Sequence, residues 1–344
     1  MRRLESNNGE TDQAYGLEPI LADSDETVSF DEIVTHIRDV VDLQPSILEA
    51  LSKSNVEMLK SLLVLWEEIP TERLRAVLEN LVILTRNDRT FDFRAIFIST
   101  LRNKDIPVRI FSIRGLVEEE QPEILHLFLD CLRDEVSDLV KVELAEALGN
   151  WVVAAELGVL STENGEILVT ALRETIEDIE TDDAVRGRAL ESLGALSGEL
   201  ISELITEQYE LGGNELRLGA LRAMGRSASP TWLDLLVFHF DDEDVNVREA
   251  AAEASGGLVT DGAIEPLTML LEEDGELSVR VAAINALAEI GSADAERVLE
   301  RIFQDGRDPS ISQPLEHALN SLQMNVDSIF GMDESADEKL QELR

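Results

Sequence analysis

The sequence is poor in several residue types that particular functions require. Its 344 residues include one cysteine, four histidines, 4% aromatic side chains and only 29 Lys and Arg against 71 Asp and Glu. A single cysteine permits no internal disulfide, which fits a reducing compartment. The segment after Met1 has no apolar run of the signal-peptide kind, and no stretch reaches the ~18 apolar residues of a membrane span. We therefore expect a cytoplasmic protein.

The charge balance narrows the classes of partner. The formal net charge is −42 at pH 7. Nucleic-acid backbones need clustered Lys and Arg to bind, and anionic membranes repel an acidic surface. We therefore expect neither nucleic acid nor membrane as a partner, but another protein or peptide that is basic. An acidic surface that only keeps a long chain soluble is an equally good interpretation.

What the sequence does contain is a phrase repeated at a fixed interval. Val247-Arg248 opens one copy, and Val279-Arg280 opens the next copy 32 residues later. A period of this length indicates a stacked array of helix pairs. We predict an all-α solenoid of about nine pairs, with more than 60% helix and no sheet. The second helices align on the Arg248 position at Gln44, Arg75, Arg109, Lys141, Arg186, Arg217, Arg248, Arg280 and Ser312.

Two columns follow from this alignment. Seven residues past the Arg position every residue is apolar except Ser255, which predicts that Leu148, Leu193, Met224 and Leu287 are buried between helices. Five residues past the Arg position every residue is polar, which predicts a solvated stripe along the array. These polar residues are Glu49, Asn80, Arg114, Glu146, Glu191, Arg222, Glu253, Asn285 and His317.

One interval breaks the rhythm. Lys141 and Arg186 are 45 residues apart, against 31 to 34 elsewhere, and the surplus falls near residues 150–163, around Trp151. An insertion in a repeat array often carries binding, although a lengthened helix with Trp151 on an edge of the core explains the spacing as well. We predict a solenoid over residues 29–326. Acidic segments of low hydrophobicity flank it at 1–28, predicted to be disordered, and at 327–344.

The repeated phrase resembles the HEAT-repeat family, specifically the phycobilisome-lyase-type HEAT-like repeat. The similarity is carried by Asp244 and Val247-Arg248 with Ala251, and by Val279-Arg280 with Ala283, Leu287 and Gly291. It implies a right-handed α–α superhelix whose second helices line a concave face. The polar column would border that face. The candidate partner-binding residues are therefore Glu146, Glu191, Arg222, Glu253 and Asn285, together with Trp151 at the insertion.

The resemblance leaves two functions open. One is a non-catalytic scaffold that binds a protein on its concave face, and the alternative is a bilin lyase or chaperone-like factor acting on a tetrapyrrole-carrying protein. Deoxyhypusine hydroxylases, which resemble this repeat class, hold two irons through His-Glu pairs, but none of the four histidines here precedes a Glu. We expect no catalytic residue, metal or cofactor. Cys131, in an apolar helical run, is expected to be a buried structural thiol.

Overall fold

The structure is a computed structural model that describes residues 28–39, 43–52, 56–66 and 68–324. Of these residues 79% are helical and none lies in a strand, which confirms the predicted all-α fold. The chain divides into two compact units, Met1–Leu116 (unit 1) and Val117–Arg344 (unit 2). The acidic segments predicted at 1–28 and 327–344 lie outside the described residues, except for Val28. Among the described helices none is both long and apolar enough to cross a membrane.

Unit 1 contains three helix pairs. Ser29 begins the first helix, because its Oγ accepts a hydrogen bond from the backbone N–H of Glu32 at 3.3 Å. The helices are α1 (Phe30–Asp39), α2 (Pro45–Ser52), α3 (Val56–Trp66), α4 (Thr71–Asn87), α5 (Arg94–Thr100) and α6 (Ile106–Leu116).

Unit 2 contains six further pairs, so the described residues form the nine pairs that the sequence predicted. In three places a 3-10 turn adjoins the first helix of a pair, and in one it opens the last second helix. The elements are α7 (Pro122–Asp134), α8 (Asp138–Glu156), α9 (Thr162–Glu177), α10 (Asp183–Leu193), α11 (Glu199–Leu211), α12 (Asn214–Arg226), η1 (Pro230–Trp232), α13 (Leu233–Phe238), η2 (His239–Asp241), α14 (Val245–Gly257), η3 (Asp261–Ala263), α15 (Ile264–Glu273), α16 (Leu277–Ile290), α17 (Ala293–Asp305), η4 (Pro309–Ile311) and the helical residues 312–324.

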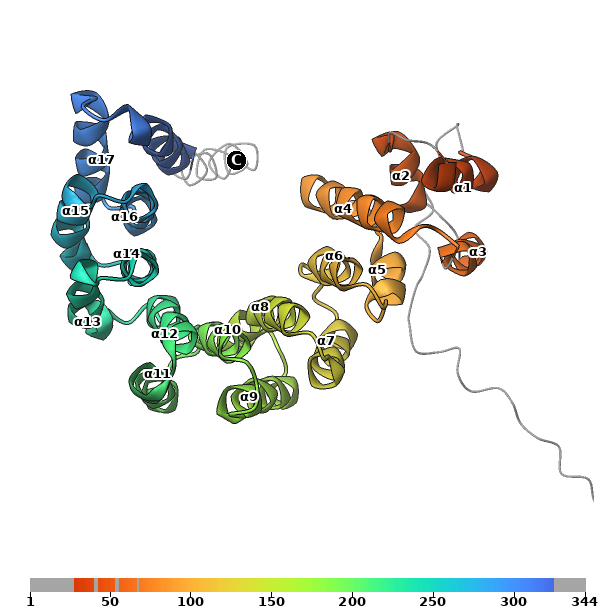
Figure 1. Cartoon of the computed structure of the whole chain (residues 1–344), viewed down its shortest axis with the longest axis horizontal. Helices are drawn as coiled ribbons and strands as arrows, with labels where there is room; N and C mark the ends of the chain where they lie inside the picture. The colour runs from red at the N-terminus through yellow and green to blue at the C-terminus, as the bar shows by residue number, and fades with distance from the viewer. Residues whose placement is uncertain (1–27, 40–42, 53–55, 67, 325–344) are drawn as a thin grey trace, which may run out of the picture. The chain divides into compact units, whose positions relative to one another are not determined.

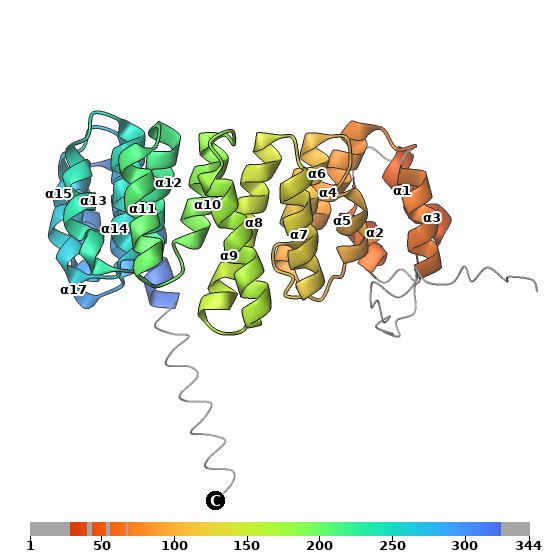
Figure 2. The same ribbon diagram turned by 90° about the horizontal axis from the view of Figure 1, so that it is seen from below.

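Within unit 2 the helices form two layers. Figures 1 and 2 show the second helices α8, α10, α12, α14 and α16 side by side in the inner layer, with the first helices outside them. The core lies between the layers. The predicted knobs Leu148, Leu193, Met224 and Leu287 are each fully buried, which confirms their role. Ser255, the polar exception, is also buried, and its hydroxyl donates a hydrogen bond to the carbonyl of Ala251 at 2.8 Å.

The inner layer is packed through very small residues. A Cβ added to Gly194 would lie 2.6 Å from the carbonyl oxygen of Ala223, and one added to Gly225 would lie 2.6 Å from the Cα of Ala254. These separations are shorter than van der Waals contact. Glycine at these positions therefore lets the backbones of neighbouring second helices approach directly. This close stacking is what brings the exposed residues of successive repeats together.

The arginines that mark the repeat also fasten one repeat to the next. Arg248 donates to the carbonyl of Asp242 at 2.8 Å and pairs with Asp274 at 2.7 Å. Arg280 pairs with Asp308 at 2.6 Å in the same manner. Arg248 thus joins the link before its own helix to the link of the following repeat, and Arg280, which also donates to the carbonyl of Leu271 in α15 at 2.9 Å, joins α15 to the link of the following repeat. Charge-assisted bonds of this kind are strong and directional, which explains why arginine recurs at this interval.

The irregular interval corresponds to a longer helix pair. α8 has 19 residues, whereas α10, α12, α14 and α16 have 11 to 14, and α9 has 16. The extra turns carry α8 past Trp151, whose side chain is 5% exposed. Gly158, with a φ of +68°, then ends the helix in the left-handed conformation that glycine adopts without strain. The surplus residues therefore lengthen helices instead of forming a separate loop.

Candidate protein-binding surface

Five of the six polar column residues of unit 2, all except His317, are the candidate partner-binding residues on five neighbouring second helices, and we call them the polar ladder. Glu146 (α8), Glu253 (α14) and Asn285 (α16) are exposed, whereas Glu191 (α10) and Arg222 (α12) are half-buried. Adjacent second helices pack against each other throughout this series. The structure therefore places the five predicted residues in one row on the inner layer.

Arg188, which the sequence argument did not single out, changes the electrostatics of the ladder. Its Nη1 lies 2.9 Å from a carboxylate oxygen of Glu191, and its Nε lies 3.9 Å from Glu146. The Glu191 side chain is only 13% exposed, so its charge is largely satisfied within the protein. Glu191 is thus a weaker candidate for a direct partner contact than Glu146 or Glu253.

Carboxylates crowd around Glu253. Partial burial raises the pKa of Glu253, although the nearby Arg222 opposes that rise, and the carboxylates of Glu249, Glu191 and Glu289 raise the pKa further. Burial also raises the pKa of Glu289. A raised pKa means that the ionised form is held at a cost in its surroundings. A cation brought close to this group would favour ionisation.

Glu289 is a residue that the column analysis missed. It follows Asn285 by one helical turn on α16, and its carboxylate lies against Gly256 of α14, 2.9 Å from where a Cβ would stand. The i, i+4 spacing places Asn285 and Glu289 on one face of α16, and this spacing is the signal from which the sequence could have identified Glu289. One column position per helix gives a single row of residues. The exposed face is in fact two residues wide at α16.

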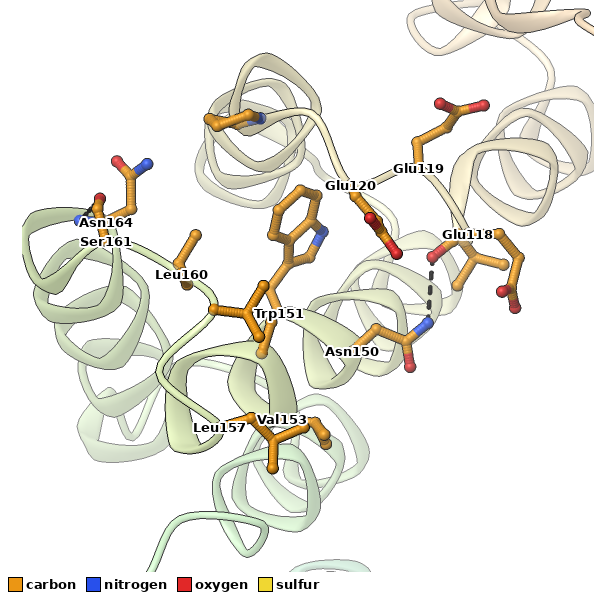
Figure 3. Close-up of a pocket in the computed structure, with 14 residues that line it drawn as sticks. Glu118, Glu119, Glu120, Asn150, Trp151, Val153, Leu157, Leu160, Ser161 and Asn164 are labelled. Atoms are coloured by element: carbon orange, nitrogen blue, oxygen red, sulfur yellow. Dashed lines mark hydrogen bonds between the residues drawn. The ribbon is translucent and has the colours of Figure 1, made fainter. Parts of the chain in front are cut away.

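Trp151 lies in a pocket at the end of α8. The pocket has a volume of about 680 Å³ and is shown in Figure 3. Apolar side chains from the last turns of α8 and from the turn into α9 line it, with a run of three glutamates on the opposite side. The lining comprises Val117, Glu118, Glu119, Glu120, Pro122, Asn150, Trp151, Val153, Ala154, Leu157, Val159, Leu160, Ser161 and Asn164.

One hydrogen bond holds the two sides of this pocket together. The side-chain amide of Asn150 donates to the carbonyl of Val117 at 3.1 Å. This bond joins α8 to the segment that carries the glutamates, and Figure 3 shows it as a dashed line from the labelled Asn150. Trp151 and Glu120 are 31 positions apart in the sequence. Only the packing of α7 against α8 brings them to one pocket.

The four histidines lie on separate elements of the fold. His36 and His239 are buried, whereas His126 and His317 are exposed. His239 joins Tyr209 at 2.7 Å and Asp242 at 3.2 Å, which links α11 to η2. Within the described residues no group of three or more His, Cys, Asp or Glu side chains is arranged to hold a metal ion. Cys131 is buried, as predicted.

The comparison with known families agrees with this architecture. The family model described as HEAT repeats matches residues 212–278 and 240–320. Residues 212–320 of this chain therefore contain HEAT repeats. The matches cover α12 to η4, where the Val-Arg phrase is clearest in the sequence. The matched description names HEAT repeats in general, so the phycobilisome-lyase type remains a prediction.

Several solved structures are similar to this chain. An engineered protein is 16% identical with a TM-score of 0.39, and the similarity covers 85% of this chain and 89% of the other. Human deoxyhypusine hydroxylase in complex with glycerol is 16% identical with a TM-score of 0.32, covering 67% and 96%. A karyopherin bound to the extreme C-terminus of a protein phosphatase is 14% identical with a TM-score of 0.45, covering 90% and 41%. No curated protein sequence matches the chain.

Proposed function

We propose that this chain is a non-catalytic scaffold that binds a basic segment of another protein on the inner helix layer of unit 2. The observation that carries the proposal is the crowding of carboxylates along that layer. Glu146, Glu253 and Glu289 are exposed on three second helices, and partial burial raises the pKa of both Glu253 and Glu289. Lys or Arg side chains of a partner would stabilise the ionised form of these carboxylates.

The charge of the whole chain supports the same class of partner. A net charge of −42 attracts a basic segment from a distance and repels polyanions. Interactions between exposed charges are screened beyond about 10 Å at 0.1 M salt. Salt should therefore slow the association of a basic partner more than it accelerates dissociation. HEAT repeats in general bind proteins, and a ladder of polar residues on successive helices offers repeated contacts to an extended segment.

A charge-reversal experiment tests the ladder. The probe is a fluorescein-labelled peptide of about 12 residues that alternates Lys and Ser, long enough to cross several helices at ~3.3 Å per residue. The double variant Glu146→Lys and Glu253→Lys should weaken binding at least about fivefold, because close like charges replace close attractions. Glu191 is left unchanged, since a lysine there would face Arg188 and endanger folding.

The matched control reverses two exposed glutamates on the outer layer. Glu203 and Glu207 on α11 carry the same charge and lie one turn apart. The Glu203→Lys and Glu207→Lys double variant should change affinity less than about twofold, because its charges are exposed on the outer layer and salt screens their interaction with a peptide bound on the inner layer. Equal weakening by the two double variants would mean that the peptide senses only net charge, and the proposal would then be abandoned.

A further inference from the structure

We infer that the pocket at the end of α8 receives one apolar side chain of the same basic segment, so that the partner is recognised by an anchor as well as by charge. The inference rests on the proposed function for the basic character of the segment. Its own evidence is the pocket of about 680 Å³ that contains Trp151. A pocket of this size admits a large aliphatic or aromatic side chain.

The walls of the pocket expose more apolar surface than a helix end requires. Leu157 is 72% exposed and Val159 is 77% exposed, although both border the pocket that holds the buried Trp151. Single exposed apolar residues are common on proteins, but apolar residues gathered around a hollow with polar residues on its rim are typical of binding sites. The last turns of α8, which α10, α12, α14 and α16 lack, create this surface.

The rim of the pocket selects the charge beside the anchor. Glu118, Glu119 and Glu120 line the side opposite α8, as Figure 3 shows. A lysine or arginine next to the anchor would meet these carboxylates. The ends of this chain are unsuitable occupants, because residues 1–28 carry seven acidic and two basic side chains and residues 327–344 carry six and two. A second copy, at −42, is disfavoured for the same reason.

The pocket continues the polar ladder. Glu146, Asn150, Val153 and Leu157 follow one another at intervals of four, three and four residues on α8, the spacing of a single helix face. A segment anchored in the pocket is therefore led along α8 to Glu146 and onto the neighbouring helices. Three steps between packed helices, at about 8–10 Å each, separate α8 from α14.

This geometry specifies the ligand. An extended chain advances ~3.3 Å per residue, so about seven to nine residues span the distance from α8 to α14. The partner segment thus has an apolar anchor with Lys or Arg beside it for the glutamate rim of the pocket. A second basic residue about five positions further on meets Glu146, which lies about 16 Å from Leu157 along α8. A third basic residue, about seven to nine positions beyond that one, meets Glu253.

Two peptides of equal charge test the anchor. One is the 12-residue Lys and Ser probe described above, and the other replaces one Ser near its end with Leu. The Leu peptide should bind the full chain about tenfold more tightly, since burial of a leucine side chain in an apolar pocket is worth about one to two decades in affinity. Fluorescence anisotropy gives both dissociation constants, and quenching of Trp151 fluorescence should accompany the Leu peptide more strongly.

Variants of the pocket wall provide the second arm. Leu157→Ser with Val159→Ser should reduce the tenfold preference to about twofold or less, because the apolar contact is lost. Leu211→Ser is the matched control: Leu211 is 77% exposed at the end of α11 and lies outside the pocket lining, so the preference should persist. Both substitutions affect exposed side chains, and circular dichroism verifies that the variants fold.

The outcomes separate the two proposals. Equal affinities for the two peptides in the unaltered chain overturn the anchor inference and leave the ladder untouched. A preserved tenfold preference in the Glu146→Lys and Glu253→Lys variant, with no loss of affinity, upholds the anchor and refutes the ladder. Sedimentation of the chain alone tests the other occupant: a dimer that Leu157→Ser dissociates would assign the pocket to a second copy instead of a peptide.

Discussion

The two units of this chain build the same helix pairs with different side chains. In unit 1 a large side chain fills the contact between two helices: the buried ring of Phe97 on α5 lies where a Cβ of Gly115 on α6 would stand. In unit 2 the second helices meet through Gly and Ala, with Gly194 against Ala223 and Gly225 against Ala254. Small residues bring backbones close, so unit 2 presents its exposed residues at short, regular intervals, as a ladder for an extended ligand requires.

The two units nevertheless share the Arg–Asp ion pair that connects successive repeats. Arg75 of unit 1 pairs with Asp105 at 2.6 Å, as Arg248 and Arg280 of unit 2 pair with Asp274 and Asp308. The connection between repeats is therefore independent of how bulky the core is. How closely the helices pack differs between the two units, whereas the Arg–Asp ion pairs that connect successive repeats occur in both. This contrast leads to three predictions beyond the binding experiments.

The largest effect is expected from a knob in the close-packed unit. Leu193→Ala should lower the free energy of unfolding by roughly 2–5 kcal/mol, because it removes a fully buried side chain and leaves a cavity between helices that cannot collapse further. Leu81→Ala is the counterpart in unit 1, where Leu81 is equally buried. Chemical denaturation measures both, and a thermal midpoint shifted by less than a degree for Leu193→Ala would show that the position is not core.

A smaller loss of stability, from a Gly→Ala substitution, should distinguish the helix packing of the two units. Gly225→Ala should destabilise by about 1–3 kcal/mol, since the new methyl group meets the Ala254 backbone of the next helix and overpacks the contact. The intrinsic preference of helices for Ala, about 1 kcal/mol, acts in the opposite direction. Gly115→Ala in unit 1 meets the ring of Phe97 instead, and a side chain yields more readily than backbone. A larger loss for Gly115→Ala than for Gly225→Ala would reverse our account of the two cores.

The smallest expected change in stability concerns the Arg–Asp ion pair between repeats, and it depends on pH. The Ser310 hydroxyl, Arg280 and the Ser310 backbone N–H lower the pKa of Asp308 to about 2. A lowered folded-state pKa stabilises the fold above the unfolded value of about 3.9, and this stabilisation disappears as pH falls toward 2. Asp308→Asn should therefore melt at a lower temperature than the unaltered chain at pH 6, and the gap should narrow between about pH 4 and pH 2.

Unit 1 supplies the comparison for this prediction. The hydrogen bond from Arg75 lowers the pKa of Asp105, against an opposing effect of burial, so Asp105→Asn should show the same narrowing of its melting gap at low pH. Measuring both variants against the unaltered chain removes the large background change from protonation of the other acidic residues. A gap that stays constant with pH in either variant would show that the carboxylate charge is not what fastens that link.

The sequence alone determined the repeat. A period near 32 residues predicted about nine helix pairs. The column seven residues past the Arg position predicted which residues are buried in the core, and the column five residues past it predicted which residues of the second helices lie outside the core. These features depend on the periodicity of one helix, which can be read along the chain. The same reasoning found Trp151 as an irregular position, because a break in a regular interval is itself a local signal.

The tertiary structure decided what those exposed residues contact. Arg188 takes up Glu191, Glu289 stands beside Gly256 of another helix, and three glutamates meet Trp151 across a pocket. Each of these contacts depends on the offset and closeness with which neighbouring helices stack. Helical periodicity fixes the face on which a residue lies, but the neighbour that it meets is set by packing between helices, which for this chain depends on where glycine lets two backbones touch.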